Sequence, residues 1–588
     1  MSKKDKTKET IGEEKSQSGI TRATFLRGGA ATMAGLASLP LIPGAAFAAP
    51  TGEFDKTSRD ELDASRGCKP WSWETKMTPI PAGEIKKTVD ADIIVVGAGL
   101  AGFSAALSAQ EAGANVIMID KNATFACRGG HITAFHSKLQ QTMGIEVDYR
   151  QVIRRWVEWA QGRVKEDMIW KFAHKSGACM DWMIDMVSPR GLKAAIWDGY
   201  YKGPDYTEMP VTHFFYTEGT NFIYTNGAVE GAGNPVLLPV LETIAKERGI
   251  RIDYKAPAVQ FVRDGDGPVE AVIAGRRGRY TRYNAAKGII IASGDYASND
   301  EMRERYAQYS LAADSQIYFP NKCNTGDLHI MAMQIGGAMQ KPEPHAAVIH
   351  LESGANSYAF LHVNGDGKRY KNEDVNTQSK SITKAYTAGN IAWSIYDADG
   401  LSVVKEQIDG GLGGGLFWGQ TFMRKGAKFD LEAEKQILDM HLKNGKVVSA
   451  DTIEGLAEKM EVPVDAFVAT VKRYNEIVAM KNDVDFGKRA DLLVPIAKPP
   501  FYAGKLLATV LTMVGGLRTN PDCAVLDEND EPIKGLYVAG SAAGDFFAGD
   551  YPTICPGIGH GRCITFGRLA GITAAGKNVD DLVPSLKV

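Results

Sequence analysis

The chain has 588 residues, of which 44% are hydrophobic and 23% charged, so it can form several globular domains with large buried cores. Its formal net charge of -3 argues against nucleic-acid binding, because phosphate contacts need a marked excess or stripe of basic residues. The seven cysteines are scattered, with no CxxC pair and no CxxCH motif, so no c-type haem, iron–sulfur cluster or zinc site is expected.

The first 48 residues have the order of a signal peptide. A polar start leads to residues 21–27 (TRATFLR), then to a Gly/Ala/Leu-rich stretch that ends in small residues. The motif resembles a Tat signal in which Ala23 replaces the second arginine. We therefore expect residues 1–48 to be a Tat-like signal peptide and the protein to be exported to the periplasm or cell surface. A polar linker is predicted over residues 49–88, and no membrane span is expected in the mature chain.

A strand, a glycine turn and a helix then follow in the order of a dinucleotide-binding site. Residues 91–96 (ADIIVV) form a continuous apolar run, residues 97–102 (GAGLAG) form the turn, and residues 103–110 form an Ala-rich helix. Such glycines permit a tight turn, close approach of the backbone to a pyrophosphate, and close helix packing. A second strand over residues 115–119 ends in Asp120, whose carboxylate can bind a ribose hydroxyl. The pattern predicts a dinucleotide and leaves FAD and NAD both open.

Three later segments resemble the flavoprotein family of fumarate reductases and succinate dehydrogenases. They are residues 287–300 (KGIIIASGDYASND), 515–519 (GGLRT) and 535–540 (GLYVAG). Shorter matches lie between them in the family's order, at residues 364–373, 450–457, 474–475, 485–487 and 499–503. The resemblance covers about residues 88–575 and implies that the cofactor is FAD.

The resemblance also implies an α/β fold in which both ends of the chain build one Rossmann-like FAD-binding domain of the GR2 type. An α+β capping, or catalytic, domain is then inserted between the two parts. The expected bounds are 89–298 and 506–588 for the FAD-binding domain and 299–505 for the cap. Substrate is expected where the cap meets the flavin.

The family pattern assigns a set of residues to FAD. These are Gly97, Ala98, Gly99, Leu100, Ala101, Gly102, Asp120, Lys121, Gly129, Gly130, His131, Ala258, Val259, Ser293, Gly294, Asp295, Gly540, Ser541, Gly557 and Ile558. In the membrane-bound members a histidine at or beside the place of His131 carries FAD covalently, whereas soluble members usually have Asn or Ser there. We expect non-covalent FAD, with attachment through His131 as the alternative.

The arginines and the histidine that hold a dianionic substrate in that family are missing at the matching positions. Those positions hold Thr377, Leu401, residues 511–513, and either Tyr551 or Ile554. Bidentate arginines are what dicarboxylate recognition requires. A fumarate or succinate enzyme is therefore not expected.

The segment that replaces the late arginine resembles the 3-ketosteroid dehydrogenase branch, whose tyrosine works beside the flavin. It contains Asp550-Tyr551-Pro552, then residues 557–559 and Thr565-Phe566-Gly567. A tyrosine can donate a hydrogen bond or a proton to a neutral substrate without demanding an anion. Tyr551 is therefore the expected catalytic residue, and simple packing of its ring on the isoalloxazine is the alternative.

His345 and Glu373 are further catalytic candidates, by their places near the family's cap histidine and in its Asn-Glu pair. A satisfied core histidine and a salt-bridged carboxylate are the alternatives for these two residues. Aromatic side chains at residues 197–206 and at Phe417-Trp418 either wall an apolar pocket or belong to the core.

Together these features predict an exported FAD-dependent oxidoreductase that acts on CH–CH groups and reduces an activated C=C bond in a neutral or weakly charged organic molecule. Electrons are expected from a separate cytochrome c or membrane quinol dehydrogenase, because an exported protein meets no NAD(P)H pool. Three alternatives stay open: a 3-ketosteroid-type dehydrogenase, an electron-transfer flavoprotein subunit, and a fumarate- or acrylate-type reductase. The last would need arginines from elsewhere, such as Arg369 or Arg518.

Overall fold

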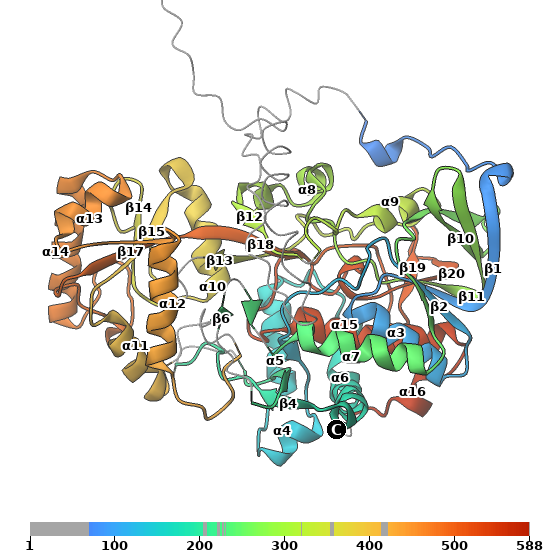
Figure 1. The fold of residues 1–588 in the computed structure, drawn as a ribbon, viewed down its shortest axis with the longest axis horizontal. Helices are drawn as coiled ribbons and strands as arrows, with labels where there is room; N and C mark the ends of the chain where they lie inside the picture. Colours follow the sequence, from blue (N-terminus) through green and yellow to red (C-terminus); the bar gives the residue numbers. More distant parts are fainter. Residues whose placement is uncertain are drawn as a thin grey trace, which may run out of the picture.

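The computed structural model describes residues 70–203, 209–219, 224–225, 228–229, 231–318, 320–352, 358–412 and 422–586. The predicted signal peptide, most of the predicted linker, and Phe417-Trp418 lie outside the described residues. Figure 1 shows a larger lobe around one sheet and a smaller lobe in yellow and orange.

An eight-stranded sheet forms the centre of the larger lobe, with a central order β19-β20-β11-β1-β2-β8. Strands β10 and β9 continue from β11 as an antiparallel extension. The bounds are β1 (Ile85–Val96), β2 (Val116–Ile119), β8 (Arg251–Asp253), β9 (Ala258–Arg263), β10 (Val269–Arg276), β11 (Arg279–Ile291), β19 (Ala524–Leu526) and β20 (Pro532–Val538). Strands β8, β2, β1, β11 and β20 are parallel, so their carboxyl ends meet at one edge, where open α/β sheets bind ligands.

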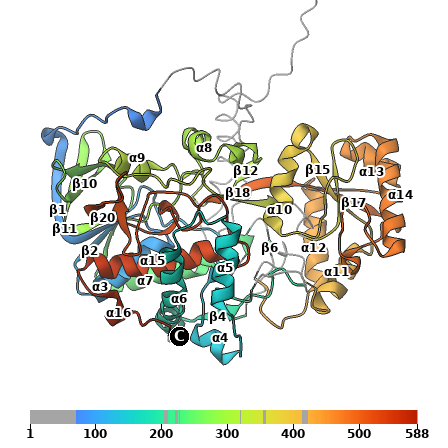
Figure 2. The same cartoon turned by 180° about the vertical axis from the view of Figure 1, so that it is seen from behind.

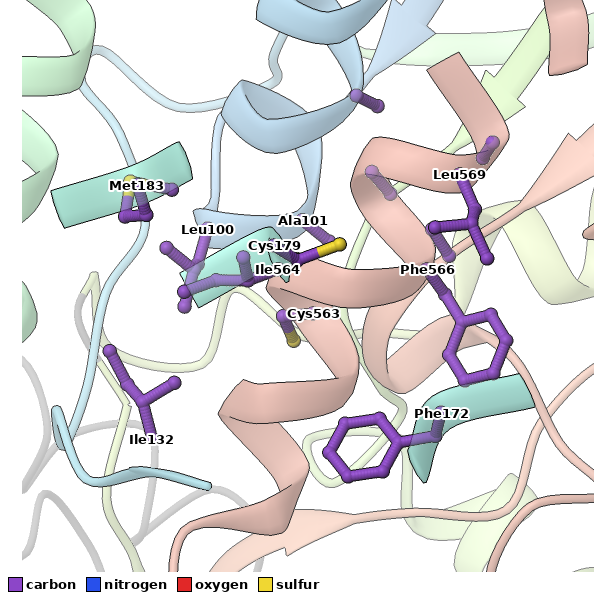
Figure 3. Close-up of a cluster of buried hydrophobic side chains, with 14 of the residues drawn as sticks. Leu100, Ala101, Ile132, Phe172, Cys179, Met183, Cys563, Ile564, Phe566 and Leu569 are labelled. Carbon is purple, nitrogen blue, oxygen red and sulfur yellow. The ribbon is translucent and has the colours of Figure 1, made fainter. Parts of the chain in front are cut away.

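Helices from both ends of the chain pack together against this sheet. Helix α3 (Leu100–Glu111) follows the glycine turn, and α15 (Ile558–Ala574) lies beside it, blue and red in Figures 1 and 2. A Cβ atom on Gly571 would lie 2.2 Å from the Ala105 carbonyl oxygen, so glycine is what lets the two helices approach so closely. Figure 3 shows Leu100 and Ala101 of α3 in one cluster with Cys563, Ile564 and Leu569 of α15. The predicted α/β class, with a core built from both ends of the chain, is confirmed.

The smaller lobe is an antiparallel sheet covered by helices. Its strand order is β14-β15-β17-β16, with bounds Leu361–Asn364, Ala392–Tyr396, Phe501–Lys505 and Val447–Ala450. The helices are α11 (Gly400–Asp409), α12 (Leu431–Lys443), α13 (Ile453–Met460) and α14 (Val464–Met480). This lobe has the α+β character expected of the cap.

A three-stranded sheet joins the two lobes, in the order β12-β18-β13. Its strands are β12 (Ser315–Gln316), β13 (Ala347–Glu352) and β18 (Leu507–Met513), and α10 (Thr377–Ile382) packs on β13. Strand β18 lies within the predicted second FAD-binding part, yet it pairs with strands of the predicted cap region. The site described below lies at this junction.

The remaining elements surround the larger lobe. They are α4 (Lys138–Thr142), α5 (Tyr149–Trp159), α6 (Glu166–Val187), α7 (Asn234–Glu247), α8 (Asp300–Tyr306), α9 (Asp327–Met333), α16 (Val579–Leu582), the sheet β3-β5-β4 (Ile132–Thr133, Thr212–Thr217, Leu192–Ile196) and the pair β6-β7 (Tyr224–Thr225, Ala228–Val229). Part of the predicted linker is packed on this lobe, since Trp73 is buried and stacks on Tyr306. Among the described helices, none combines the length and apolar character needed to cross a membrane.

Candidate functional site

Two cavities meet at the carboxyl edge of the central sheet. The first has a volume of about 940 Å³ and lies over the glycine turn that follows β1. The second, of about 810 Å³, lies between the larger lobe and the three-stranded sheet that joins the two lobes. Arg128 and His560 line both cavities, so these two side chains stand at the boundary between them.

The glycine turn forms one wall of the first cavity. Gly97 has φ +119°, and a Cβ atom there would lie 2.3 Å from the Ala292 carbonyl oxygen. Gly99 lines the cavity, and its nearest neighbour to an added Cβ is 3.5 Å away, so the cavity side of this glycine is open. The backbone is therefore bare where a pyrophosphate would approach, at the N-terminus of α3.

Acidic and basic groups mark the far end of the first cavity. The Asp120 carboxylate accepts hydrogen bonds from the Ala98 and Asn122 backbone N–H groups, both at 2.7 Å, and burial raises its pKa. Lys121 donates to Asp327, at 2.8 Å. This arrangement after β2 suits a ribose, whose hydroxyls can donate to the carboxylate.

The residues of the first cavity fit FAD. Asn234 is buried and lines the cavity, and its Oδ1 has no hydrogen-bond partner among the described residues, while its Nδ2 donates to the Arg128 carbonyl oxygen at 2.7 Å. A buried acceptor without a donor is costly, so it indicates a donor supplied by a ligand. The bare turn, the ribose carboxylate and this free acceptor together match a dinucleotide.

The structure brings many of the predicted FAD residues to one surface. Those lining the first cavity are Gly97, Ala98, Gly99, Leu100, Ala101, Asp120, Lys121, Ala258, Ser293, Gly294 and Ser541. Those lining the second are Gly129, His131 and Gly557.

The other predicted FAD residues lie outside the lining of both cavities. They are Gly102, Gly130, Val259, Asp295, Gly540 and Ile558. Three of the glycines serve close packing: an added Cβ would lie 1.9 Å from the Gly97 carbonyl oxygen at Gly102, 2.2 Å from the Gly233 Cα at Gly130, and 2.7 Å from the Ala101 Cβ at Gly540.

The second cavity is walled by apolar and neutral polar side chains. Trp197 lines it from the larger lobe, and Leu511 lines it from β18. Val348 and His350 lie two residues apart on β13 and line the cavity from the same face of that strand. Asn376, Thr377 and Gln378 close it from the start of α10. Of the predicted aromatic wall, Trp197 is in place, and residues 204–206 lie outside the described ranges.

Tyr551 lines the second cavity with its hydroxyl held in a defined orientation. The Gly559 backbone N–H donates to the Tyr551 hydroxyl oxygen at 3.0 Å, which leaves the hydroxyl proton free to be donated. Its ring packs on Phe547, with 5.1 Å between ring centroids. Burial raises the pKa of Tyr551 to about 12, so it is a neutral donor at physiological pH.

Two of the histidines that line the second cavity, His350 and His560, are neutral as well. Burial, with the nearby His131 and Arg128, lowers the pKa of His350 to about 4. Burial beside Arg128 lowers that of His560 to about 3, and His560 Nδ1 donates to the His131 carbonyl oxygen at 3.0 Å. The His131 ring stacks on Phe422, with centroids 4.6 Å apart.

Arg128 is the one arginine among the described residues that line either cavity. It lies 3.5 Å from the buried Asp295 carboxylate, donates to the Leu511 carbonyl oxygen, and stacks over the Tyr318 ring at 4.7 Å. Asp295 is held in place by Thr512 and by the Met513 N–H, at 2.5 and 3.0 Å. The charge of Arg128 is thus already paired.

His345 and Glu373 are buried away from both cavities. His345 Nδ1 bonds to the Tyr296 hydroxyl at 2.6 Å, and its ring stacks on Tyr306 at 4.7 Å. Glu373 pairs with Arg369 at 2.8 Å and lies 3.6 Å from Lys488. Both placements match the structural alternatives given for these residues, a core histidine and an ion-paired carboxylate.

The two arginines considered as substitutes for the family's clamp are also engaged elsewhere. Arg369 is shared between Glu373 and Asp483, and Arg518 pairs with Asp530. Neither lines a cavity.

Several site residues were not singled out from the sequence. Arg128 adjoins the predicted Gly129-Gly130 turn, and its place in the chain was the available signal. Asn376 and His560 likewise adjoin Thr377 and residues 557–559, whereas His350 had no such signal, because the pairing of β13 with β18 brings it to the cavity. Among the described residues, no group of three or more His, Cys, Asp or Glu side chains could hold a metal ion.

Comparisons with known proteins agree with this geometry. Residues 92–558 match the model of the FAD binding domain family. A vinyl phenol reductase from Lactiplantibacillus plantarum is 28% identical over 510 residues, which cover 82% of this chain and 96% of that protein.

Two solved structures share the fold. An open conformation of a flavocytochrome c3 fumarate reductase superposes with a TM-score of 0.64 at 24% identity, covering 86% of this chain and 82% of that one. A 3-ketosteroid-delta4-(5alpha)-dehydrogenase from Rhodococcus jostii RHA1 gives 0.61 at 22% identity, covering 85% and 100%.

Proposed function

The chain belongs to the FAD binding domain family, and from this premise we propose that it reduces a C=C bond conjugated to a phenol or a similar neutral, polar group. It is an FAD-dependent oxidoreductase, and FAD, when bound, supplies the hydride-transfer chemistry.

The observation that carries the substrate class is the charge state of the second cavity. Tyr551 is a neutral donor, His350 and His560 are neutral, and the guanidinium of Arg128 is paired with Asp295. A dicarboxylate needs two unpaired cationic clamps to offset its desolvation. A neutral phenolic alkene needs donors, acceptors and apolar walls, and these are what the described part of the cavity offers. The similarity to the vinyl phenol reductase favours the same class.

Six residues of the second cavity then have defined roles. Tyr551 presents its proton to the substrate, and the Gly559 N–H stabilises the oxygen as the proton leaves. His350 offers a neutral group for the substrate's polar end, beside Asn376, whose amide is held by the Ser379 N–H and the Thr553 hydroxyl. Trp197 and Leu511 exclude water around the alkene.

The experiment uses the purified, FAD-loaded protein with reduced methyl viologen as electron donor. We expect turnover of 4-vinylphenol and of neutral enones, and turnover of fumarate and urocanate at least about a hundredfold slower, the effect of losing about 2.7 kcal/mol. Oxidation of viologen without any alkene is the control. Rapid turnover of fumarate with no turnover of vinylphenol or enones would overturn the proposal.

The donor and the compartment form a second, separate part of the proposal. A sequence without a CxxCH motif, together with the Tat-like order of residues 1–48, supports an exported enzyme fed by a separate cytochrome c or membrane quinol dehydrogenase. Fractionation of cells tests export, with an Arg22→Lys, Arg27→Lys double variant as the signal-deficient control. Accumulation of both forms in the cytoplasm would contradict export.

FAD is proposed to be held non-covalently. The His131 ring is packed against Phe422 and Trp197, at 4.6 and 4.7 Å between centroids, which supports a role as wall rather than as attachment point. Acid precipitation of the denatured protein tests this, because non-covalent FAD stays in the supernatant. A yellow pellet that becomes colourless in His131→Asn would show attachment instead.

A further inference from the structure

Arg562 is a buried cation that the proposed reaction does not use. It lies in the second turn of α15, two residues after His560, and its residue is 1% exposed. Its Nη1 donates to the Ala543 carbonyl oxygen at 3.0 Å, and its guanidinium stacks over Phe547 at 4.5 Å.

Arg562 has no carboxylate partner among the described residues. Its Nε and Nη2 lack any hydrogen-bond partner in that part of the chain. Burial lowers its pKa to about 10, so the side chain still carries a full charge at neutral pH. A buried charge without a counter-ion is unfavourable. The burial of Arg562 therefore implies that a compensating negative charge lies near it in the working protein.

The place of Arg562 shows where that negative charge would lie. Phe547 links Arg562 to the second cavity, because its ring contacts the Arg562 guanidinium, at 4.5 Å, and the Tyr551 ring, at 5.1 Å between centroids. Besides burial, the charge of Arg128, which lines both cavities, and that of its partner Asp295 affect the pKa of Arg562. On α15 the neighbouring His560 and Cys563 line the first cavity, and Tyr551 lines the second, so Arg562 lies behind the walls of both cavities.

We infer that Arg562 is an electrostatic positioning residue, whose charge raises the reduction potential of the bound flavin by stabilising its reduced, negatively charged state. Reduction adds negative charge to the flavin, and a fixed cation in a low-dielectric region favours the more negative state. The inference rests on FAD binding in the first cavity and is independent of which alkene is reduced.

A matched arginine on the same helix provides the control. Arg568 is also buried and also stacks over an aromatic ring, Trp182 at 4.3 Å. Unlike Arg562, it pairs with a carboxylate, Glu111 at 2.7 Å. Neither arginine lines a cavity, and Arg568 lies six residues further along α15, away from the helix start that lines the second cavity. The two arginines thus differ in charge compensation and in position along α15, and resemble each other in burial and stacking.

The test measures the midpoint potential of the FAD-loaded protein by anaerobic dye equilibration, with no substrate present. We expect Arg562→Met to shift the ratio of reduced to oxidised flavin at least tenfold toward the oxidised form, which is about 30 mV for a two-electron couple. Arg562→Lys keeps the charge and should retain most of the wild-type potential. Arg568→Met should leave the potential unchanged.

Arg562→Gln serves where Met prevents folding, because its amide can still donate to the Ala543 carbonyl oxygen. An unchanged potential in the Met or Gln variant would overturn the inference, as would an equal fall in Arg562→Lys. A substrate panel that fails while the potential shifts as expected would count against the proposed function and leave the role of Arg562 standing.

Discussion

At the scale of single residues, the second cavity is lined by neutral hydrogen-bond donors. Tyr551 is the one best placed to donate a proton. Its oxygen is anchored by the Gly559 N–H, so the hydroxyl proton has one direction left in which to be donated. His350 and His560 have pKa values of about 4 and 3, so at neutral pH neither is an imidazolium that could act as a general acid. We therefore expect proton transfer to substrate to depend on Tyr551.

We expect Tyr551→Phe to lower kcat for alkene reduction by about 10²- to 10⁴-fold, the usual contribution of a positioned general acid. Flavin reduction by viologen should stay rapid, because it needs no proton from this residue. Stopped-flow measurement of the two half-reactions separates the effects. Tyr306→Phe is the matched control: its pKa is also raised to about 12 by burial, yet its hydroxyl contacts Met333 away from both cavities. Equal loss of activity in both variants would contradict the assignment.

Glu373 illustrates the opposite case, a buried charge with a structural role. Arg369 donates to both of its carboxylate oxygens, at 2.9 and 2.8 Å, and the His362 N–H adds a third bond at 3.2 Å.

We expect Glu373→Gln to destabilise the protein by about 3 kcal/mol, because buried cations lose their partner, while kcat per folded molecule is retained. Urea denaturation together with active-site titration measures both quantities. Asp485→Asn, which breaks an exposed pair with Arg473 in the same lobe, should hardly move the denaturation midpoint. Lost turnover in a Glu373→Gln protein of normal stability would instead place Glu373 at the substrate.

At the scale of elements, the turn between β1 and α3 has two roles, one in packing and one at the first cavity. Gly97 and Gly102 bring strand and helix together, and Gly99 keeps the backbone bare toward the first cavity. The α3–α15 contact then orients the start of α15, which lines the second cavity through Gly557, Gly559 and His560. The cofactor turn and the substrate wall are thus coupled through a single helix pair.

Gly97→Ala should abolish this arrangement. The new Cβ would lie 2.3 Å from the Ala292 carbonyl oxygen, in a backbone conformation with φ +119° that disfavours side chains. We expect FAD binding to weaken at least tenfold, about 1.4 kcal/mol, by flavin fluorescence titration. Gly113→Ala has a positive φ of +90° but no atom within 4 Å of the added Cβ, so it should keep FAD affinity. Equal weakening in both would show that backbone strain, and not the collision, is responsible.

At the scale of the whole molecule, the sequence predicted what local patterns encode. The apolar run before Gly97 and the glycine spacing specify strand, turn and helix within twenty residues, and these elements are confirmed. His350 could not be found this way, because the pairing of β13 with β18, about 160 residues later, brings it to the cavity. Whether His345 or Glu373 touches substrate depended on tertiary packing that no spacing reveals.

The first cavity is assembled from distant parts of the chain, which has a thermodynamic consequence. Its lining comes from the turn after β1, from α7, from the turn after β11, from α9 and from α15. A ligand that binds this cavity in the folded state alone stabilises every segment at once.

FAD should therefore raise the melting temperature of the apoprotein progressively with concentration. At a free concentration of one hundred times Kd, the free energy of unfolding is expected to rise by about 2.7 kcal/mol. Thermal scans of apoprotein with increasing FAD measure this, and FMN is the control because it lacks the adenosine part that Asp120 and Lys121 would meet. FMN should stabilise much less than FAD. Asp120→Ala should narrow the difference between the two, since the ribose carboxylate is then gone. If the melting temperature of the wild-type protein does not change with FAD, or rises equally with FAD and with FMN, then the first cavity does not hold the dinucleotide.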